Sequence, residues 1–274
     1  MLYQRRKVKV QGKVIVVTGA GSGIGRELSL HLISKGARVA GVDLNEKALD
    51  ETAVLAADYK YHFRGYVANM ADRSAVEALP AQIFSRFGEV DGIINNAGII
   101  QPFSRLNDLD YATIERVLKV NLYGTLYIVK TFLPHLLNRP EAHIVNLSSM
   151  GGFVPVPGQT IYCAAKAAVK LLSEGLASEL SHTNIRVTVV CPGAVATNIR
   201  SNSGVCSPKT TSSSGATKAL LPTKAAEIIV RGIENNAYHV FVGKDAMLMD
   251  KFYRLSPATA ARMIARKMSA LLPE

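Results

Sequence analysis

The chain has 274 residues, of which 48% are hydrophobic and 19% charged, so it carries enough apolar material for a substantial core. No run approaches the roughly 18 apolar residues of a transmembrane helix, and the basic N-terminus lacks the apolar stretch of a signal peptide. These features predict a cytoplasmic protein. The three cysteines form neither a CxxC pair nor a Cys/His cluster, so neither a disulfide framework nor a metal site is expected.

The formal net charge is +11, and the basic residues are unevenly distributed. Several crowd residues 5–13, and residues 180–226 contain no acidic side chain at all. No zinc-finger or RNA-binding motif accompanies this charge, so no nucleic-acid partner is expected. We interpret the charge mainly as solvated surface, with weak contact to an anionic partner or membrane surface left open.

Short apolar runs rich in Val and Ile alternate with segments of helical pattern along the chain. The expected strands are 14–19, 38–43, 59–67, 90–98, 143–149, 185–193 and 238–243. The expected helices are 24–35, 45–57, 72–87, 108–138, 160–181 and 223–235. Continuous apolar strands separated by helices predict an α/β fold: a doubly wound, Rossmann-type parallel sheet of about seven strands in three α/β/α layers. We expect a single domain spanning residues 1–274.

Two segments depart from this alternation. Residues 200–222 are rich in Ser, Thr and Gly and have little periodicity, which is typical of either a disordered loop or a mobile lid over a substrate site. Residues 245–272 have a helical pattern with basic side chains among Leu, Met, Ile and Ala. This tail is expected to pack on its own subunit, although a basic amphipathic helix could also touch a membrane surface or a partner.

The first expected strand runs into a glycine-rich turn, 19–25, and then into a helix. Glycine lets the backbone approach a pyrophosphate closely, and the N-terminus of the following helix offers unpaired N–H groups and partial positive charge. This strand–turn–helix context predicts a dinucleotide site. The residues expected to form it are Gly19, Ser22, Gly23, Ile24 and Gly25.

Asp43 ends the second strand, 24 residues after Gly19. A carboxylate at that place can accept hydrogen bonds from both adenosine-ribose hydroxyls and would repel a 2′-phosphate. NAD is therefore the preferred cofactor, while NADP remains possible because Arg26 could partly offset the repulsion. Asp43 could instead serve only as a cap for the helix that begins near Asn45.

Six motifs follow one another at the ends of the expected elements. They are Thr18-Gly19-x-x-x-Gly23-x-Gly25, Asn95-Asn96-Ala97-Gly98, Asn121, Ser149, Tyr162-x-x-x-Lys166 and Pro192-Gly193-x-Val195-x-Thr197. Each alone could arise by chance, but together and in this order they are specific. Over residues 10–243 the chain resembles the classical short-chain dehydrogenase/reductase family. The resemblance implies an NAD(P)-dependent oxidoreductase that interconverts an alcohol and a ketone or aldehyde.

Tyr162 and Lys166 are four residues apart and therefore share one face of a helix. Oxidising an alcohol requires removal of its hydroxyl proton, and a free tyrosine, with a pKa of about 10, is a poor base at neutral pH. A lysine ammonium about 4 Å away would contribute on the order of 4 kcal/mol at an effective dielectric constant of 20, or up to roughly three pKa units. We therefore expect Tyr162 to transfer the proton.

Further roles follow from the resemblance. Ser149 would hydrogen-bond the substrate oxygen, with Ser148 displaced by one position from the family spacing. Lys166 would also bind the nicotinamide ribose, and Asn121 would hold a water that links Lys166 to solvent. The remaining cofactor contacts implied by the resemblance are Asn95, Ala97 and Gly98 on the adenosine side, Asn69 beside the adenine, Pro192 and Gly193 opening the last motif, and Val195 and Thr197 at the nicotinamide carboxamide.

The histidines do not form a triad with Ser149, and we expect His143 to lie at the surface. Residues 153–157, with Val195, Ile199 and 200–222, are expected to form an apolar substrate pocket for a hydrophobic alcohol or carbonyl compound.

One alternative function is reduction of a 3-oxoacyl thioester, because the basic stretch 180–226 suits an anionic acyl carrier. A distant alternative is a non-catalytic dinucleotide sensor. The resemblance also implies a homodimer or homotetramer built through helices 108–138 and 160–181.

Overall fold

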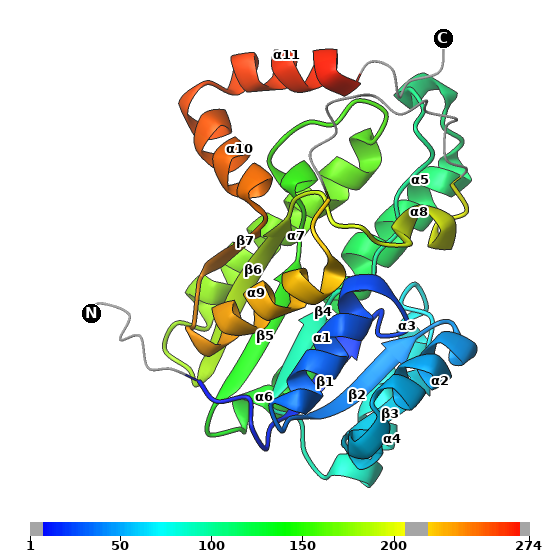
Figure 1. Cartoon of the computed structure of the whole chain (residues 1–274), viewed down its shortest axis with the longest axis vertical. Helices are drawn as coiled ribbons and strands as arrows, with labels where there is room; N and C mark the ends of the chain where they lie inside the picture. Colours follow the sequence, from blue (N-terminus) through cyan, green and yellow to red (C-terminus); the bar gives the residue numbers. More distant parts are fainter. Residues whose placement is uncertain (1–7, 206–218, 269–274) are drawn as a thin grey trace.

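The computed structural model describes residues 8–205 and 219–268, and its centre is a parallel sheet of seven strands. Their order across the sheet is β3-β2-β1-β4-β5-β6-β7 (Figure 1). All neighbours are parallel, and the sequence order of the strands reverses between β1 and β4. The strands are β1 Val14–Thr18, β2 Arg38–Asp43, β3 Phe63–Val67, β4 Gly92–Asn95, β5 Ala142–Leu147, β6 Ile185–Pro192 and β7 His239–Val242. The predicted doubly wound fold is confirmed.

The sheet is buried on both faces because successive side chains of each strand point in opposite directions. In β1, Val14 and Val16 belong to one hydrophobic cluster, whereas Ile15 and Val17 belong to another. All five residues of this strand are buried. Two separate cores on either side of one sheet explain why the strands read as continuous apolar runs.

Helices cover each face of this sheet (Figure 1). Buried side chains of α1 Gly23–Ser34, α2 Glu46–Leu55 and α9 Pro222–Glu234 complete one core. Those of α3 Arg73–Glu77, α4 Leu79–Phe87, α6 Gly124–Leu137 and α7 Thr160–Glu179 complete the other. Within the described parts of the chain, no helix is both long and apolar enough to cross a bilayer.

Three expected elements differ in detail from those observed. The third strand starts at Phe63, because residues Ala57–His62 form a 3₁₀ helix. The helix expected at 72–87 is two helices, and Pro80 lies in the first turn of the second, where its missing N–H is tolerated. The stretch expected at 108–138 consists of α5 Tyr111–Leu118 and α6, joined by a π-helical turn, Lys119–Tyr123.

The C-terminal tail is two helices rather than one. They are α10 Lys244–Leu255 and α11 Pro257–Met268, and Ser256 between them has a non-helical backbone (φ −149°, ψ 79°). The residue before a proline is disfavoured in the helical region, which explains the break. In Figure 1 the two helices lie beyond the end of β7, and α11 runs crosswise along the top of the view. The last residues of the predicted tail, 269–272, lie outside the described chain.

His143 is buried, so its predicted surface position is wrong. The ring lies at the start of β5, where Nε2 is 2.8 Å from Thr188 Oγ1 and Nδ1 has no hydrogen-bond partner among the described residues. Burial, with a smaller contribution from Arg186, lowers the pKa of His143 to about 4 from 6.5. A position at a strand start favoured the surface, but helices cover both faces of this central strand and all six of its residues are buried.

This burial leads to a prediction about stability and pH. The unfolded chain takes up a proton on His143 near pH 6.5 and the folded chain only near pH 4, so stability is lost as the pH falls through this window. We expect His143 to account for roughly 3 kcal/mol of lost unfolding free energy between these limits. Urea unfolding at pH 7 and pH 4.5 would show a smaller loss in His143→Gln than in the wild type. Equal losses in the two proteins would contradict the prediction.

Candidate active site

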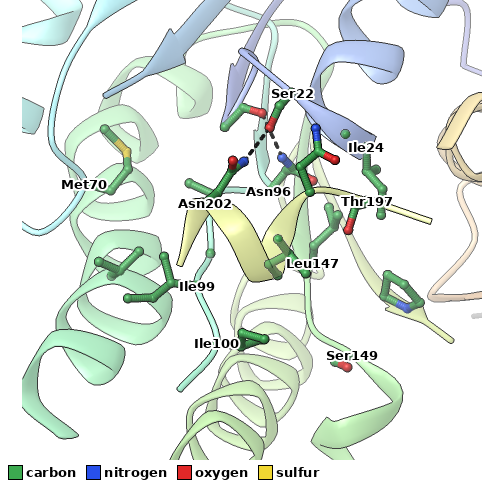
Figure 2. A pocket seen from close by; sticks show the side chains of 18 of the residues that line it. Ser22, Ile24, Met70, Asn96, Ile99, Ile100, Leu147, Ser149, Thr197 and Asn202 are labelled. Carbon is green, nitrogen blue, oxygen red and sulfur yellow. Dashed lines mark hydrogen bonds between the residues drawn. The ribbon is translucent and has the colours of Figure 1, made fainter. Parts of the chain in front are cut away.

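A cavity of about 360 Å³ opens where the strands end, at the point where the strand order reverses. Figure 2 shows the side chains that point into it from the glycine-rich turn, the loops after β4 and β5, and α8 Ile199–Asn202. The predicted residues that line it are Gly19, Ser22, Gly23, Ile24, Asp43, Asn69, Ala97, Gly98, Ser149, Tyr162, Lys166, Pro192, Gly193, Val195 and Thr197. The structure therefore brings most of the predicted site together.

The glycine-rich turn leaves room for an anion. Gly19 and Gly23 adopt positive φ angles of 68° and 53°, which side-chain-bearing residues rarely adopt. Ser22, the N-cap of α1, makes no side-chain hydrogen bond to the first turn of that helix. The N–H groups at the start of α1 can therefore receive a phosphate, so the residues present fit the pyrophosphate of a dinucleotide.

Asp43 lies at the cavity wall, where its carboxylate is held by two backbone N–H groups. Oδ2 accepts from Gly21 at 2.9 Å and Oδ1 from Asn45 at 3.0 Å. The guanidinium of Arg26 donates to Glu51 Oε2 at 2.6 Å and to Thr52 Oγ1 at 3.1 Å, and Nη2 also contacts the Gly21 carbonyl. Arg26 is thus already paired with a carboxylate. This pairing weakens the expected ability of Arg26 to offset the repulsion between Asp43 and a 2′-phosphate.

Ser149, Tyr162 and Lys166 meet where β5 ends and α7 begins. Ser149 follows β5, and its hydroxyl accepts from Gly151 N at 3.0 Å. Tyr162 lies in the first turn of α7 and hydrogen-bonds Ser149. Lys166 is one turn later, and its Nζ lies 5.9 Å from the Tyr162 ring centroid. Ser149 and Tyr162 can therefore act on one substrate oxygen, with Lys166 close to the tyrosine ring.

The electrostatics of this group differ from the expected pattern. Burial raises the pKa of Tyr162, and the hydrogen bond with Ser149 lowers it in part. Lys166 Nζ donates to the Leu147 carbonyl at 2.9 Å, and burial lowers its pKa to about 8. The predicted lowering of the Tyr162 pKa by Lys166 is wrong, because burial outweighs the other influences on the hydroxyl.

Asn121 lies beneath this group, in the π-helical turn. Its Nδ2 donates to the carbonyls of Ile99 and Val117, both at 2.9 Å, while Oδ1 has no partner among the described residues. A Cβ on Gly98 would lie 2.7 Å from this Oδ1 and 3.3 Å from Lys166 Nζ. Gly98 therefore keeps open a small polar space between the amide and the ammonium, which fits the expected bridging water.

Ser148 has a different task from its neighbour. Its hydroxyl is buried and donates to the Lys166 carbonyl at 2.7 Å. This hydrogen bond joins the end of β5 to α7. Ser149 is thus the serine whose hydroxyl faces Tyr162, in agreement with the spacing argument.

Some predicted residues do not line the cavity. Gly25 and Asn121 are buried behind it, and Asn95 donates from Nδ2 to Asn146 Oδ1 at 2.8 Å inside the sheet. The residues expected to wall the substrate pocket, 153–157, also lie elsewhere, and Phe153 packs edge-on against Phe241. Of the 200–222 segment, residues 206–218 lie outside the described chain.

Sequence reasoning missed several residues that line the cavity or hold the loops that line it. Asn202 on α8 donates to Ser22 Oγ at 2.9 Å across the cavity, as Figure 2 shows. Asp245 accepts from Ala194 N at 2.8 Å, and a Cβ on Gly193 would lie only 2.2 Å from its Oδ2. No periodicity or motif marks either residue, because each acts through a contact between distant segments. Other lining residues missed are Leu44, Ala68, Met70, Asn96, Ile99, Ile100, Val120, Leu147 and Asn198.

Comparisons with known proteins agree with this geometry. The family model described as short chain dehydrogenase matches residues 13–205. A putative oxidoreductase SadH of Mycobacterium tuberculosis is 34% identical over 270 residues, covering 96% of this chain and 98% of the relative. The 3-oxoacyl-[acyl-carrier-protein] reductase FabG of Haemophilus influenzae is 36% identical over 192 residues, covering 69% and 77% of the two chains.

Solved structures give the same result. A short-chain dehydrogenase/reductase from Burkholderia phymatum in complex with NAD superimposes with a TM-score of 0.80 at 26% identity, covering 90% of this chain and 96% of the other. A 3-ketoacyl-(acyl-carrier-protein) reductase from Brucella melitensis complexed with NADH gives 0.77 at 27% identity, covering 85% and 97%. The chain belongs to the short-chain dehydrogenase family. It is a nicotinamide-dependent oxidoreductase that acts on CH–OH groups.

Proposed function

We propose that the protein interconverts a hydrophobic secondary alcohol and its ketone, with NAD as preferred cofactor and Tyr162 as the proton-transfer group. The observation that carries the proposal is the meeting of Ser149, Tyr162 and Lys166 at the wall of the dinucleotide cavity. NAD, when bound, supplies the site that accepts or delivers hydride. The substrate class is supported by the apolar side chains of Met70, Ile99, Ile100, Leu147, Val195 and Ile199 that line the same cavity.

The chain's own residues divide the remaining work. Tyr162 takes the hydroxyl proton in oxidation and returns it in reduction, while Ser149 hydrogen-bonds the substrate oxygen and steadies its developing charge. Lys166 would hold the nicotinamide ribose. The buried Oδ1 of Asn121, which has no partner among the described residues, would hold a water that connects Lys166 to solvent.

The experiment that tests this proposal is a panel assay of the purified protein. Hydrophobic secondary alcohols and ketones are supplied with NAD(H) or NADP(H), and absorbance at 340 nm follows turnover. The proposal expects turnover of at least one alcohol/ketone pair and a higher kcat/KM with the NAD couple. NADH binding without turnover of any compound would contradict it and favour a dinucleotide sensor.

Reduction of a 3-oxoacyl thioester is the second candidate function. It is supported by the relative and the structural neighbour whose names give that activity, and by the acid-free stretch 180–226. A 3-oxoacyl thioester carried on an acyl carrier protein belongs in the same panel. A kcat/KM for the thioester well above that for every free ketone would favour this candidate.

The NAD preference gives a prediction at Asp43. Its carboxylate, held by the N–H groups of Gly21 and Asn45, would face a 2′-phosphate with like charge. In Asp43→Ser we expect the kcat/KM ratio of NADP to NAD to rise at least about tenfold, equivalent to ~1.4 kcal/mol. Glu46→Gln is the control. It removes an exposed carboxylate at the start of α2 and should leave the ratio unaltered. An unchanged ratio in Asp43→Ser would contradict the assignment.

Assembly and location stay predictions. A homodimer or homotetramer through α5, α6 and α7 is supported by Leu171 on α7 and Tyr123 before α6, which are 70% and 46% exposed. Weak membrane-surface contact through the tail is supported by Leu248 and Leu255, which are exposed on α10 beside Lys251. The cytoplasmic location and the single-domain organisation rest on the sequence argument.

A further inference from the structure

The first turn of α7 carries Tyr162 but has no cap from its own sequence. Its N-cap residue, Gln159, makes no side-chain hydrogen bond to the helix. The N–H groups of a first helical turn have no partner within the helix and normally require an acceptor from the N-cap side chain or from water. In α7 the acceptor must therefore come from elsewhere.

Gln101, in the loop after β4, supplies it. Its Oε1 accepts from Ile161 N at 2.9 Å and from Tyr162 N at 3.1 Å. Its Nε2 donates to the Gly158 carbonyl at 3.1 Å, and its own carbonyl accepts from Gln159 Nε2 at 2.8 Å. The residue is completely buried. Gln101 thus performs the work of an N-cap side chain from a distant part of the chain.

The same loop also forms part of the cavity wall. The three residues before Gln101, at 98–100, all line the cavity. The N–H of Ile100 donates to Ser203 Oγ at 3.0 Å, which ties the loop to the end of α8 as well. Any movement of the α7 first turn relative to the dinucleotide cavity must therefore strain or break the hydrogen bonds of Gln101.

We propose that Gln101 is a positioning residue that holds the first turn of α7, and with it the Tyr162 hydroxyl, in register with the cofactor cavity. This inference rests on the proposed role of Tyr162 in proton transfer. Without the amide oxygen, two buried N–H groups lose their acceptor and the turn shifts to find another. A shift of about 1 Å in a reacting group can lower the rate on the order of 100-fold.

Three variants test the proposal through kinetics. Gln101→Met keeps the approximate size of the side chain but removes both the acceptor of the Ile161 and Tyr162 N–H groups and the donor to the Gly158 carbonyl. It should lower kcat by roughly 10- to 100-fold while the Kd for NADH changes less than about threefold. Gln101→Glu keeps the acceptor at the positive end of the helix but replaces the donor to the Gly158 carbonyl with an oxygen, so its kcat should lie between those of Gln101→Met and the wild type. Gln159→Met is the matched control, because it removes only the reciprocal hydrogen bond to the Gln101 carbonyl. Its kcat should remain near that of the wild type.

A second measurement needs no substrate. Amide hydrogen exchange at Ile161 and Tyr162 reports whether these N–H groups are held by an acceptor. Exchange should be at least about tenfold faster in Gln101→Met than in the wild type, and near the wild-type rate in Gln159→Met. This readout separates the positioning of the turn from the chemistry of the site.

The outcomes are distinguishable. A normal kcat or normal exchange in Gln101→Met overturns the proposal, as does an equal loss of kcat in Gln159→Met, which would indicate general packing. A loss confined to NADH binding overturns it too. If the wild type turns over no alcohol, ketone or thioester of the panel, the proposed function fails, and the exchange rates alone decide whether Gln101 holds the turn.

Discussion

Replacing Tyr162 with Phe is expected to lower kcat by about 10²–10⁴-fold, the usual contribution of a positioned general acid or base. The ring remains in place beside Lys166, so only the hydroxyl that hydrogen-bonds Ser149 is lost. The Kd for NADH should change little, because the cavity keeps its shape. Steady-state kinetics with the best panel substrate, together with NADH fluorescence titration, would separate these two effects.

An exposed tyrosine provides the control for this variant. Tyr111 begins α5 and is 83% exposed, so Tyr111→Phe should retain both kcat and NADH affinity. A Tyr162→Phe protein with wild-type turnover would contradict the proton-transfer role. The outcome would then require another proton donor, and Ser149 would be the first to test, since it contacts the same hydroxyl.

Replacing Gly25 with Ala is expected to cause the largest loss of cofactor binding. An added Cβ would lie 2.0 Å from the Gly19 carbonyl oxygen and 2.4 Å from Asn96 Nδ2. Because the nearest atom is backbone, α1 and the glycine-rich turn must move apart, which disrupts the N–H groups that would receive the pyrophosphate. We expect the Kd for NADH to rise by roughly 100-fold, equivalent to ~2.8 kcal/mol, and the unfolding free energy to fall by about 1–3 kcal/mol.

Gly175 offers the same substitution at an exposed position of α7, since no atom of the described residues outside its own stretch of helix lies within 4 Å of an added Cβ. Gly175→Ala should therefore bind NADH normally and gain up to about 1 kcal/mol from the better helix propensity of alanine. Isothermal titration with NADH and urea unfolding of both variants would check the pair. A Gly25→Ala protein with unchanged NADH affinity would show that the turn adapts, against the prediction.

The order of strands and helices follows from sequence because each core face imposes its own pattern. The alternating burial of Val14 and Ile15 on two sides of the sheet requires a continuous apolar run, and such a run can be recognised. Breaks within helices were harder to locate. The division at Pro80 and the π turn at Asn121 keep the helical pattern on both sides, so periodicity alone predicts one helix.

The residues of the site also fall into two groups, those that the sequence identifies and those that only the folded chain reveals. Tyr162, Lys166 and the glycine-rich turn are local in sequence, so spacing identifies them. Asn202 on α8 reaches the cavity, and Asp245 on α10 holds the loop at Ala194 beside it; only the folded chain brings these segments together. The direction of the Tyr162 pKa shift also needed the structure, because its dominant cause is burial.

A crystal structure of the NAD complex tests the central claim most directly. The account predicts the Tyr162 hydroxyl and Ser149 Oγ on the substrate side of the nicotinamide, both within about 2.6–3.2 Å of a common point where the reacting oxygen can sit. Lys166 should lie against the nicotinamide ribose. A Tyr162 ring turned away from the nicotinamide, or a Lys166 side chain remote from the ribose, would contradict the account.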